Sequence, residues 1–267
     1  MAEEVKTISR ITLNGIVAAD DDLWLYDLFG YTAFSPRSVR EAIDADTDGE
    51  LVLEINSGGG SVFAGFEIYS LLRNAKCRTV AEVQSLAASA ASTIISGCST
   101  VRMSPVAQVM LHLPSLTTEG NQADHRDSIR LLNSITGSIL NGYESKCGGK
   151  TTRDRLETLM KNETWLTADE AVELGLADEI IDFVCPIERT PGAADVQNNY
   201  SIAALDGYVN GHVPSAAELK AMLGRVAADW CPETKREPPA LTPCPDAIDF
   251  SDWRITARVK LEKSRFL

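Results

Sequence analysis

The strongest constraint on the fold is a short apolar run that ends in three consecutive glycines. Residues 51–56, Leu-Val-Leu-Glu-Ile-Asn, lead into Ser57 and the glycine run 58–60, and apolar residues at helical spacing follow over 62–75. The pattern predicts a strand, a glycine loop and a helix. Glycines after a strand let the backbone approach a ligand and expose its N–H groups. The loop suits an oxyanion hole or a phosphate cradle, although by itself such a loop is more often a tight turn between a strand and a helix.

Strand and helix signals alternate through the first 184 residues, which predicts an α/β fold. Besides 51–56, the expected strands are 11–17, 79–84, 100–103, 108–112 and 176–184. The expected helices are 36–45, 62–75, 87–95 and 121–146, with two more opening at the capping boxes of Thr151 and Thr167.

The character of the chain changes after about residue 185. Linker-like stretches rich in proline, 190–194 and 236–245, flank one short helical pattern at 215–229. We therefore expect one domain over residues 1–185, followed by a loosely ordered, linker-rich tail over 186–267 with one short helix.

Composition and charge argue against several classes of function. The chain has 267 residues, 44% of them hydrophobic, which is enough for a sizeable core. A net charge of −13 argues against nucleic-acid binding as the main function. No apolar run reaches the length of a membrane span, and no signal peptide is visible, so we expect a cytoplasmic protein without membrane partners. The six cysteines are scattered without a Cys-x-x-Cys pair, so we expect no metal site, disulfide framework or cofactor.

A serine stands at the next strand–helix junction. Ser89 lies within Ala-Ala-Ser-Ala-Ala-Ser, residues 87–92, where a strand gives way to a helix of small residues. A serine there sits at the positive end of the helix dipole, and the N–H of Ala90 can point at a developing oxyanion. Ser89 is thus a candidate nucleophile, and on this feature alone a helix N-cap explains it equally well.

The chain has only three histidines. His112 ends the apolar strand Val-Met-Leu and precedes a proline turn, whereas His125 lies in a polar helical stretch and His212 in the tail. If the site uses a histidine base, His112 is the candidate. We reject Cys98 as a rival nucleophile because it lies at the negative end of a helix, which raises the pKa of a thiol.

Four motifs together resemble the ClpP peptidase family. They are Asn-Ser-x-Gly-Gly from residue 56, Ala-Ala-Ser at 87–89, Val-Met-Leu-His at 109–112, and Leu-Thr-Ala-x-Glu-Ala at 166–171. Their order and approximate spacing agree with the family over about residues 9–184. The resemblance implies a serine endopeptidase with the ClpP/crotonase fold, a spiral of β-β-α units.

The resemblance also implies catalytic roles. Ala-Ala-Ser places the nucleophile at Ser89, and Val-Met-Leu-His places the general base at His112. The second family glycine falls on Gly60, whose N–H would form the oxyanion hole with that of Ala90.

Two departures from the family pattern affect the site. The third member of the triad, an Asp in the family, falls on Glu163, whose longer side chain must fold back to reach His112. Gly58 replaces the usual proline. Either carboxylate can orient an imidazole and stabilise imidazolium, and Asp154 is the reserve candidate.

Within the family, the chain is most similar to phage head-maturation (prohead) proteases. The segment 163–168, the serine-containing run 87–92 and the long tail carry this resemblance. It implies capsid or scaffold proteins as substrates and no ATPase partner, whereas a cellular ClpP subunit, the alternative, works with an ATPase. The region of helix 121–146 mediates subunit contacts in ClpP relatives, so we expect a homo-oligomer.

Three further interpretations remain open. A crotonase-type acyl-CoA enzyme shares the fold but does not require a Ser-His-acid set. A membrane-bound signal-peptide peptidase uses a Ser/Lys pair and an anchor, which the sequence does not show. A catalytically inactive scaffold or assembly protein is the third, and labelling by a fluorophosphonate separates it from a peptidase.

Overall fold

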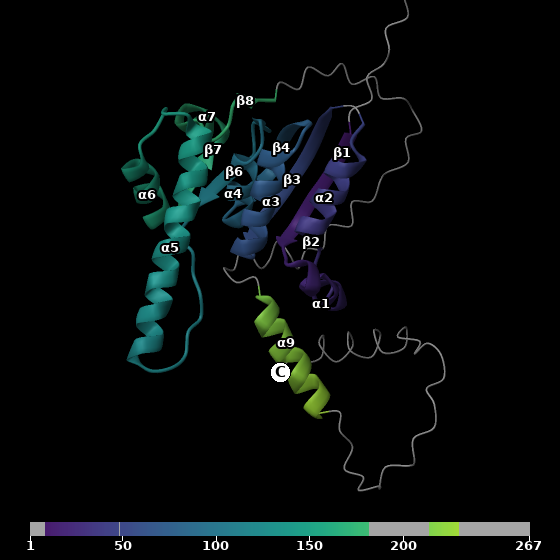
Figure 1. The fold of residues 1–267 in the computed structure, drawn as a ribbon, viewed down its shortest axis with the longest axis vertical. Coiled ribbons are helices and arrows are strands. Elements are labelled where there is room, and N and C mark those ends of the chain that lie inside the picture. The colour runs from purple at the N-terminus through teal and green to yellow at the C-terminus, as the bar shows by residue number, and fades with distance from the viewer. Residues whose placement is uncertain (1–8, 48, 182–213, 230–267) are drawn as a thin grey trace, which may run out of the picture.

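The computed structural model describes residues 9–47, 49–181 and 214–229, and it shows an α/β structure built on a parallel sheet (Figure 1). The strands are β1 (Ser9–Val17), β2 (Ala33–Phe34), β3 (Glu50–Gly60), β4 (Arg78–Ala88), β5 (Thr100–Met103), β6 (Gln108–Leu111), β7 (Thr164–Thr167) and β8 (Glu179–Ile180). The helices are η1 (Asp20–Asp22), α1 (Leu23–Leu28), α2 (Pro36–Ala45), α3 (Val62–Asn74), α4 (Ala90–Ser96), α5 (Gln122–Cys147), α6 (Arg153–Lys161), α7 (Ala168–Leu174) and α9 (Ala216–Asp229). The predicted α/β class is confirmed.

Strand β4 organises the sheet, whose order is β2-β1-β3-β4-β5-β8 with parallel pairing throughout. The first half of β4 pairs with β5, and its last residues pair with β6, so that Ala88 lies opposite Met110. Strand β7 then pairs antiparallel with β6. Because β4 and β6 end side by side, the residues that follow them, Ser89 and His112, are brought together.

The core lies between the sheet and the helices that cover one of its faces, with α2, α3 and α4 lying over β1, β3 and β4 (Figure 1). Side chains of a strand alternate between its two faces. Leu51, Leu53 and Ile55 of β3 therefore lie on one face, and all three are fully buried in the core cluster. Each such side chain contributes about 1.5–3 kcal/mol by its burial. On the opposite face Glu54 forms an ion pair with Arg10. The buried face therefore fixes the register that places the strand ends.

Several elements differ from the sequence-based expectation. Strand β3 continues through the glycine run to Gly60, α4 begins at Ala90 instead of residue 87, and η1, α1 and β2 were not predicted. Strand β4 continues to Ala88 instead of ending near residue 84, because its last residues find a partner in β6. Helix α6 is capped by Thr152, whose hydroxyl accepts the Arg155 N–H, and not by Thr151. Strand β7, just before the helix that Thr167 caps as expected, was not predicted. Four residues are too short for the alternation that identifies a strand.

Helix α9 confirms the short helix expected at 215–229, and it packs against α1. Its Leu219 is fully buried in a cluster with Leu25 and Tyr26, and Lys220 forms an ion pair with Asp22. This contact ties part of the predicted tail to the predicted first domain. The boundary at 185, the linkers on either side of α9 and the end of the last expected strand lie outside the described residues.

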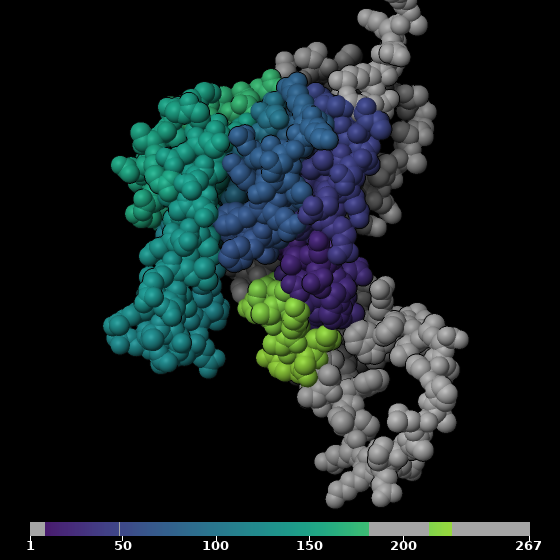
Figure 2. Space-filling model, in the orientation of Figure 1, coloured from purple at the N-terminus to yellow at the C-terminus, as the bar shows by residue number. Residues whose placement is uncertain are grey.

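Helix α5 extends beyond the body of the molecule, together with the segment that precedes it (Figure 2). Its last turns carry Ile139 and Tyr143 into the core, while Ile129 is 57% exposed near its beginning. Among the described residues, no helix has the length and apolar character needed to cross a membrane.

Candidate active site

Ser89 stands at the turn between β4 and α4 in a strained backbone conformation. Its φ is +55° and its ψ is −122°, a region that non-glycine residues rarely adopt. Its N–H donates to the carbonyl of Met110 on β6, at 3.0 Å. The buried alanines around it, Ala88, Ala90 and Ala91, allow the strand and the helix to pack closely. The turn leaves the Ser89 hydroxyl half-buried and directed at the end of β6.

The hydroxyl meets His112, the residue that follows β6. The distance between Ser89 Oγ and His112 Nε2 is 2.6 Å, within the range for direct proton transfer. Burial lowers the pKa of His112, an effect that the charge of Glu163 partly opposes. The imidazole is therefore neutral at neutral pH and can accept a proton. Of the other histidines, His125 is exposed on α5, and His212 lies outside the described residues.

Glu163 lies beside His112 because of the pairing between β6 and β7. The last paired residues are Leu111 and Thr164, so one further step of the antiparallel register sets Glu163 opposite His112. The Glu163 backbone is left-handed, with φ +47°. Its carboxylate is exposed and acts on His112 through its charge, since no hydrogen bond joins the two side chains in the described structure. Asp154 lies instead on the exposed first turn of α6.

The glycine loop closes the other side of the site. A Cβ atom on Gly59 would lie 2.7 Å from Ser89 Cβ and 2.9 Å from the Ala90 nitrogen, so only glycine allows this approach. The next residue, Gly60, packs against β1, where the Ser61 N–H donates to the Val17 carbonyl at 2.7 Å. Because Gly59 contacts the β4–α4 turn and Gly60 contacts β1, the two glycines hold the loop between the nucleophile and β1.

Sequence reasoning missed two residues of this loop. Gly59 approaches Ser89 closely, and the only sign of this in the sequence was the run of three glycines. The buried Ser57 donates its hydroxyl to the Gly15 carbonyl at 2.6 Å and accepts the Gly59 N–H at 3.1 Å. It thereby fixes the loop from both sides, and its place in the Asn-Ser motif gave no sign of this role.

A sequence profile of the family described as Clp protease matches residues 41–183, which include this entire site. The chain belongs to the Clp protease family. The recognition of a ClpP-type serine peptidase family from the motifs is thus confirmed.

Curated relatives of this Clp protease family member include bacterial proteins. The ATP-dependent Clp protease proteolytic subunit of Porphyromonas gingivalis is 29% identical over 140 residues, which cover 52% of this chain and 62% of the relative. The ATP-dependent Clp protease proteolytic subunits 1 of Chlamydia muridarum and of Chlamydia trachomatis serovar D are each 32% identical over 136 residues, covering 49% of this chain and 69% of the relative. These names say nothing of a phage branch, which stays a prediction.

The rival nucleophile Cys98 is buried. Its burial raises the pKa of the thiol to about 12, so it carries no thiolate at neutral pH. The rejection of Cys98 in this Clp protease family member is confirmed. Within the described residues, no group of three or more His, Cys, Asp or Glu side chains gathers in a way that could hold a metal ion.

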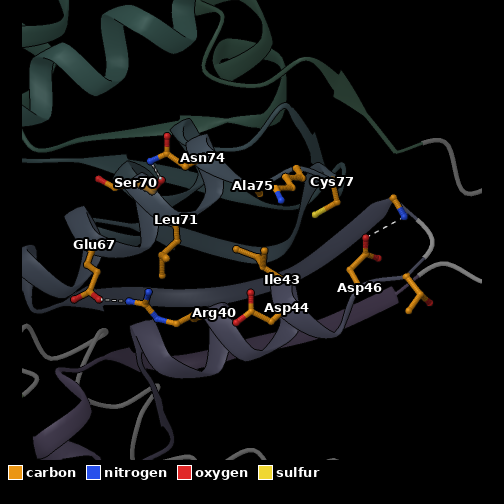
Figure 3. A pocket seen from close by; sticks show the side chains of 13 residues that line it. Arg40, Ile43, Asp44, Asp46, Glu67, Ser70, Leu71, Asn74, Ala75 and Cys77 are labelled. Carbon is orange, nitrogen blue, oxygen red and sulfur yellow. Dashed lines mark hydrogen bonds and ion pairs between the residues drawn. The ribbon is translucent and has the colours of Figure 1, made fainter.

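A cavity of about 710 Å³ lies away from the Ser89–His112 site, between α2 and α3 (Figure 3). An ion pair between Arg40 and Glu67 spans it, and Asp46 accepts the Gly49 N–H at its edge. None of the residues that line the cavity belongs to the Ser89–His112 site. It therefore does not receive the group on which that pair would act.

Proposed function

We propose that this chain is a serine endopeptidase in which Ser89 is the nucleophile and His112 the general base. The observation that supports this most directly is the 2.6 Å contact between Ser89 Oγ and His112 Nε2. As Ser89 Oγ bonds to the peptide carbonyl carbon, its proton passes to His112. The same proton then goes to the leaving amine as the C–N bond breaks, and water hydrolyses the acyl-enzyme by the reverse sequence of transfers.

The proposed oxyanion hole consists of the N–H groups of Gly60 and Ala90. Both lie beside Ser89, because Gly59 brings the loop against the nucleophile and the Ala90 nitrogen. Two fixed backbone donors stabilise the negative oxygen of the tetrahedral intermediate without reorganisation.

The proposed acid is Glu163, with Asp154 as the alternative. Protonation of His112 creates an imidazolium ion, and a neighbouring negative charge stabilises it. Glu163 is the carboxylate whose charge raises the pKa of His112. Because the Glu163 side chain is exposed, solvent screens this interaction, and we expect a contribution smaller than that of a buried triad carboxylate.

A fluorophosphonate probe tests the proposed chemistry directly. It should label the wild-type protein at Ser89, found by peptide mapping, and should leave Ser89→Ala unlabelled. A wild-type protein that resists labelling would favour an inactive scaffold or assembly protein over a peptidase.

The proposed substrates are proteins. Apolar side chains are exposed at three positions next to site residues in the chain or the sheet: Phe63 follows the glycine loop, Leu113 follows His112, and Trp165 pairs with Met110. Such side chains bind the apolar residues of an extended peptide. For the biological role we propose cleavage of capsid or scaffold proteins within a phage prohead or the host cytoplasm, on the resemblance of segment 163–168.

A second role is favoured by the names of the curated relatives, which are proteolytic subunits of ATP-dependent proteases. Incubation with a purified capsid or scaffold protein, with Ser89→Ala as control, separates the two roles. Specific cleavage without an ATPase supports the prohead role. Cleavage of folded proteins only when an ATPase and ATP are added supports the cellular one.

The pH profile of kcat/KM should distinguish the two acids. Cleavage needs neutral His112, so activity is present above the pKa of His112 and is lost as the pH falls through it. Burial lowers that pKa from its usual value of 6.5, so the acid limb should lie below pH 6.5. Glu163→Gln removes the charge that raises the pKa, so the limb should shift further toward acid, while the plateau rate falls roughly tenfold.

The matched control for this profile is Asp154→Asn, which should leave both the limb and the plateau unchanged. The opposite pattern, a silent Glu163→Gln and an inactive Asp154→Asn, would transfer the role to Asp154.

We propose a homo-oligomer that uses the extended half of α5. The apolar side chains of this helix fall into two groups: Ile135, Ile139 and Tyr143 are buried in the core of the chain, while Ile129 and Leu131 are 57% and 46% exposed. Contact between copies would bury these exposed side chains.

Light scattering at working concentrations should give a mass that is a multiple of the 28.9 kDa chain. Combined Ile129→Asp and Leu131→Asp should lower the mass, whereas Arg130→Ala between them should not. A monomeric wild-type protein would contradict the proposal.

A further inference from the structure

A buried chain of hydroxyl groups leads from α5 to the backbone of the nucleophile. Ser92, one helical turn after Ser89, donates its hydroxyl hydrogen to the Ser89 carbonyl at 2.6 Å. The Tyr143 hydroxyl of α5 lies 2.7 Å from the Ser92 hydroxyl. Ser92 and Tyr143 are each only 1% exposed, so water does not compete for these bonds. The proposed mechanism uses neither side chain.

The donor and the acceptor of each hydrogen bond between these hydroxyl groups follow from the number of hydrogens available. A serine hydroxyl has one hydrogen, and Ser92 gives it to the Ser89 carbonyl. The bond between Ser92 and Tyr143 therefore has Tyr143 as its donor. Burial raises the pKa of Tyr143, so the phenol keeps its hydrogen. Each bond in such a chain strengthens the next by polarisation.

The carbonyl at the end of the chain belongs to the same peptide group as the Ala90 N–H. In a trans peptide the C=O and N–H bonds point in opposite directions. A carbonyl held toward Ser92, inside the protein, therefore directs the Ala90 N–H away from Ser92. The glycine loop lies next to this N–H group, since a Cβ on Gly59 would lie 2.9 Å from the Ala90 nitrogen.

We propose that Ser92 and Tyr143 are positioning residues that hold the Ser89–Ala90 peptide group with its N–H directed at the oxyanion. This inference rests on the proposed function, since it assigns a task to the proposed oxyanion donor. The strained backbone of Ser89, with φ +55°, is the reason that such a restraint is needed. The Ser89 carbonyl also accepts the Ser92 N–H at 3.0 Å and the Thr93 N–H at 3.4 Å. Loss of the two hydroxyl groups therefore weakens the restraint on the peptide group without abolishing it.

Kinetics of Ser92→Ala and Tyr143→Phe on a model peptide, together with the affinity of a peptide boronate, test the proposal. The boronate forms a tetrahedral adduct with the nucleophile and places an oxygen in the oxyanion hole. We expect Ser92→Ala to lower kcat roughly tenfold with little change in KM, and to weaken boronate binding by a similar factor. Tyr143→Phe should act in the same direction and more weakly. The double variant should be no worse than Ser92→Ala, because both act through one carbonyl.

The matched control is Ser96→Ala. Ser96 is also buried on α4, and its hydroxyl donates to the Thr93 carbonyl at 2.6 Å, one turn further from the site. Its loss should leave kcat and boronate affinity unchanged.

Three outcomes would overturn the inference. If the wild-type protein is active, unchanged kinetics in both Ser92→Ala and Tyr143→Phe would overturn this inference and leave the proposed function standing. A loss of kcat in Ser96→Ala equal to that in Ser92→Ala would do the same. A wild-type protein that neither cleaves peptides nor reacts with a fluorophosphonate would overturn the proposed function, and the inference with it.

Discussion

Ser89→Ala is expected to reduce peptide cleavage by about 10⁴-fold or more, and His112→Ala by a comparable factor. The first variant removes the atom that forms the acyl-enzyme. The second removes the base that lies 2.6 Å from that atom. Because the two groups act as one unit, the double variant should lose little more than either single variant. Initial rates on a model peptide, measured at equal protein concentration, provide the test.

An exposed serine on β4, the strand that precedes Ser89, supplies the control. Ser85 lies on β4, four residues before the nucleophile, and is exposed. Ser85→Ala should retain wild-type rates, and all variants should unfold at similar temperatures. Full activity in Ser89→Ala would refute the assignment of the nucleophile, whatever the other variants show.

The parts of the site that the sequence predicted are those set by local patterns. Ser89 and His112 each follow an apolar strand directly, and parallel strands bring their carboxyl ends to one edge of a sheet. Their proximity therefore follows from strand order, which the motifs of the family implied. The fold class was predictable for the same reason, since strands and helices alternate along the chain.

The parts that the sequence did not predict depend on contacts between distant segments. Glu163 was named only through the family resemblance, because its position beside His112 is set by the short strand β7, whose pairing with β6 has no signal in four residues. The hydrogen bond between Tyr143 and Ser92, which continues from Ser92 to Ser89, joins residues 51 positions apart in the sequence. At helical spacing Tyr143 resembled any other apolar residue of α5, and only the packing of α5 on α4 reveals its hydroxyl partner.

Gly59→Ala is expected to reduce activity by about a hundredfold or more. The new Cβ would lie 2.7 Å from Ser89 Cβ, 2.8 Å from the Ala88 carbonyl oxygen and 2.9 Å from the Ala90 nitrogen. Two of these are backbone atoms, so no side-chain rotation relieves the collision. The glycine loop must move away from the β4–α4 turn, which separates Gly60 from the nucleophile. Displacements of about 1 Å within a catalytic site cost on the order of 10²-fold in rate.

Gly149→Ala separates this collision from backbone strain. Gly149 has a φ of +88°, close to the +97° of Gly59, but a Cβ there would meet no atom within 4 Å. Both variants carry the cost of a positive φ, about 1 kcal/mol of folding stability. Only Gly59→Ala adds a Cβ atom that collides with the turn carrying the nucleophile. Peptide cleavage and fluorophosphonate labelling should therefore be about a hundredfold slower or more in Gly59→Ala and should keep wild-type rates in Gly149→Ala. Wild-type rates in Gly59→Ala would show that the approach of the loop to Ser89 is not part of the catalytic geometry.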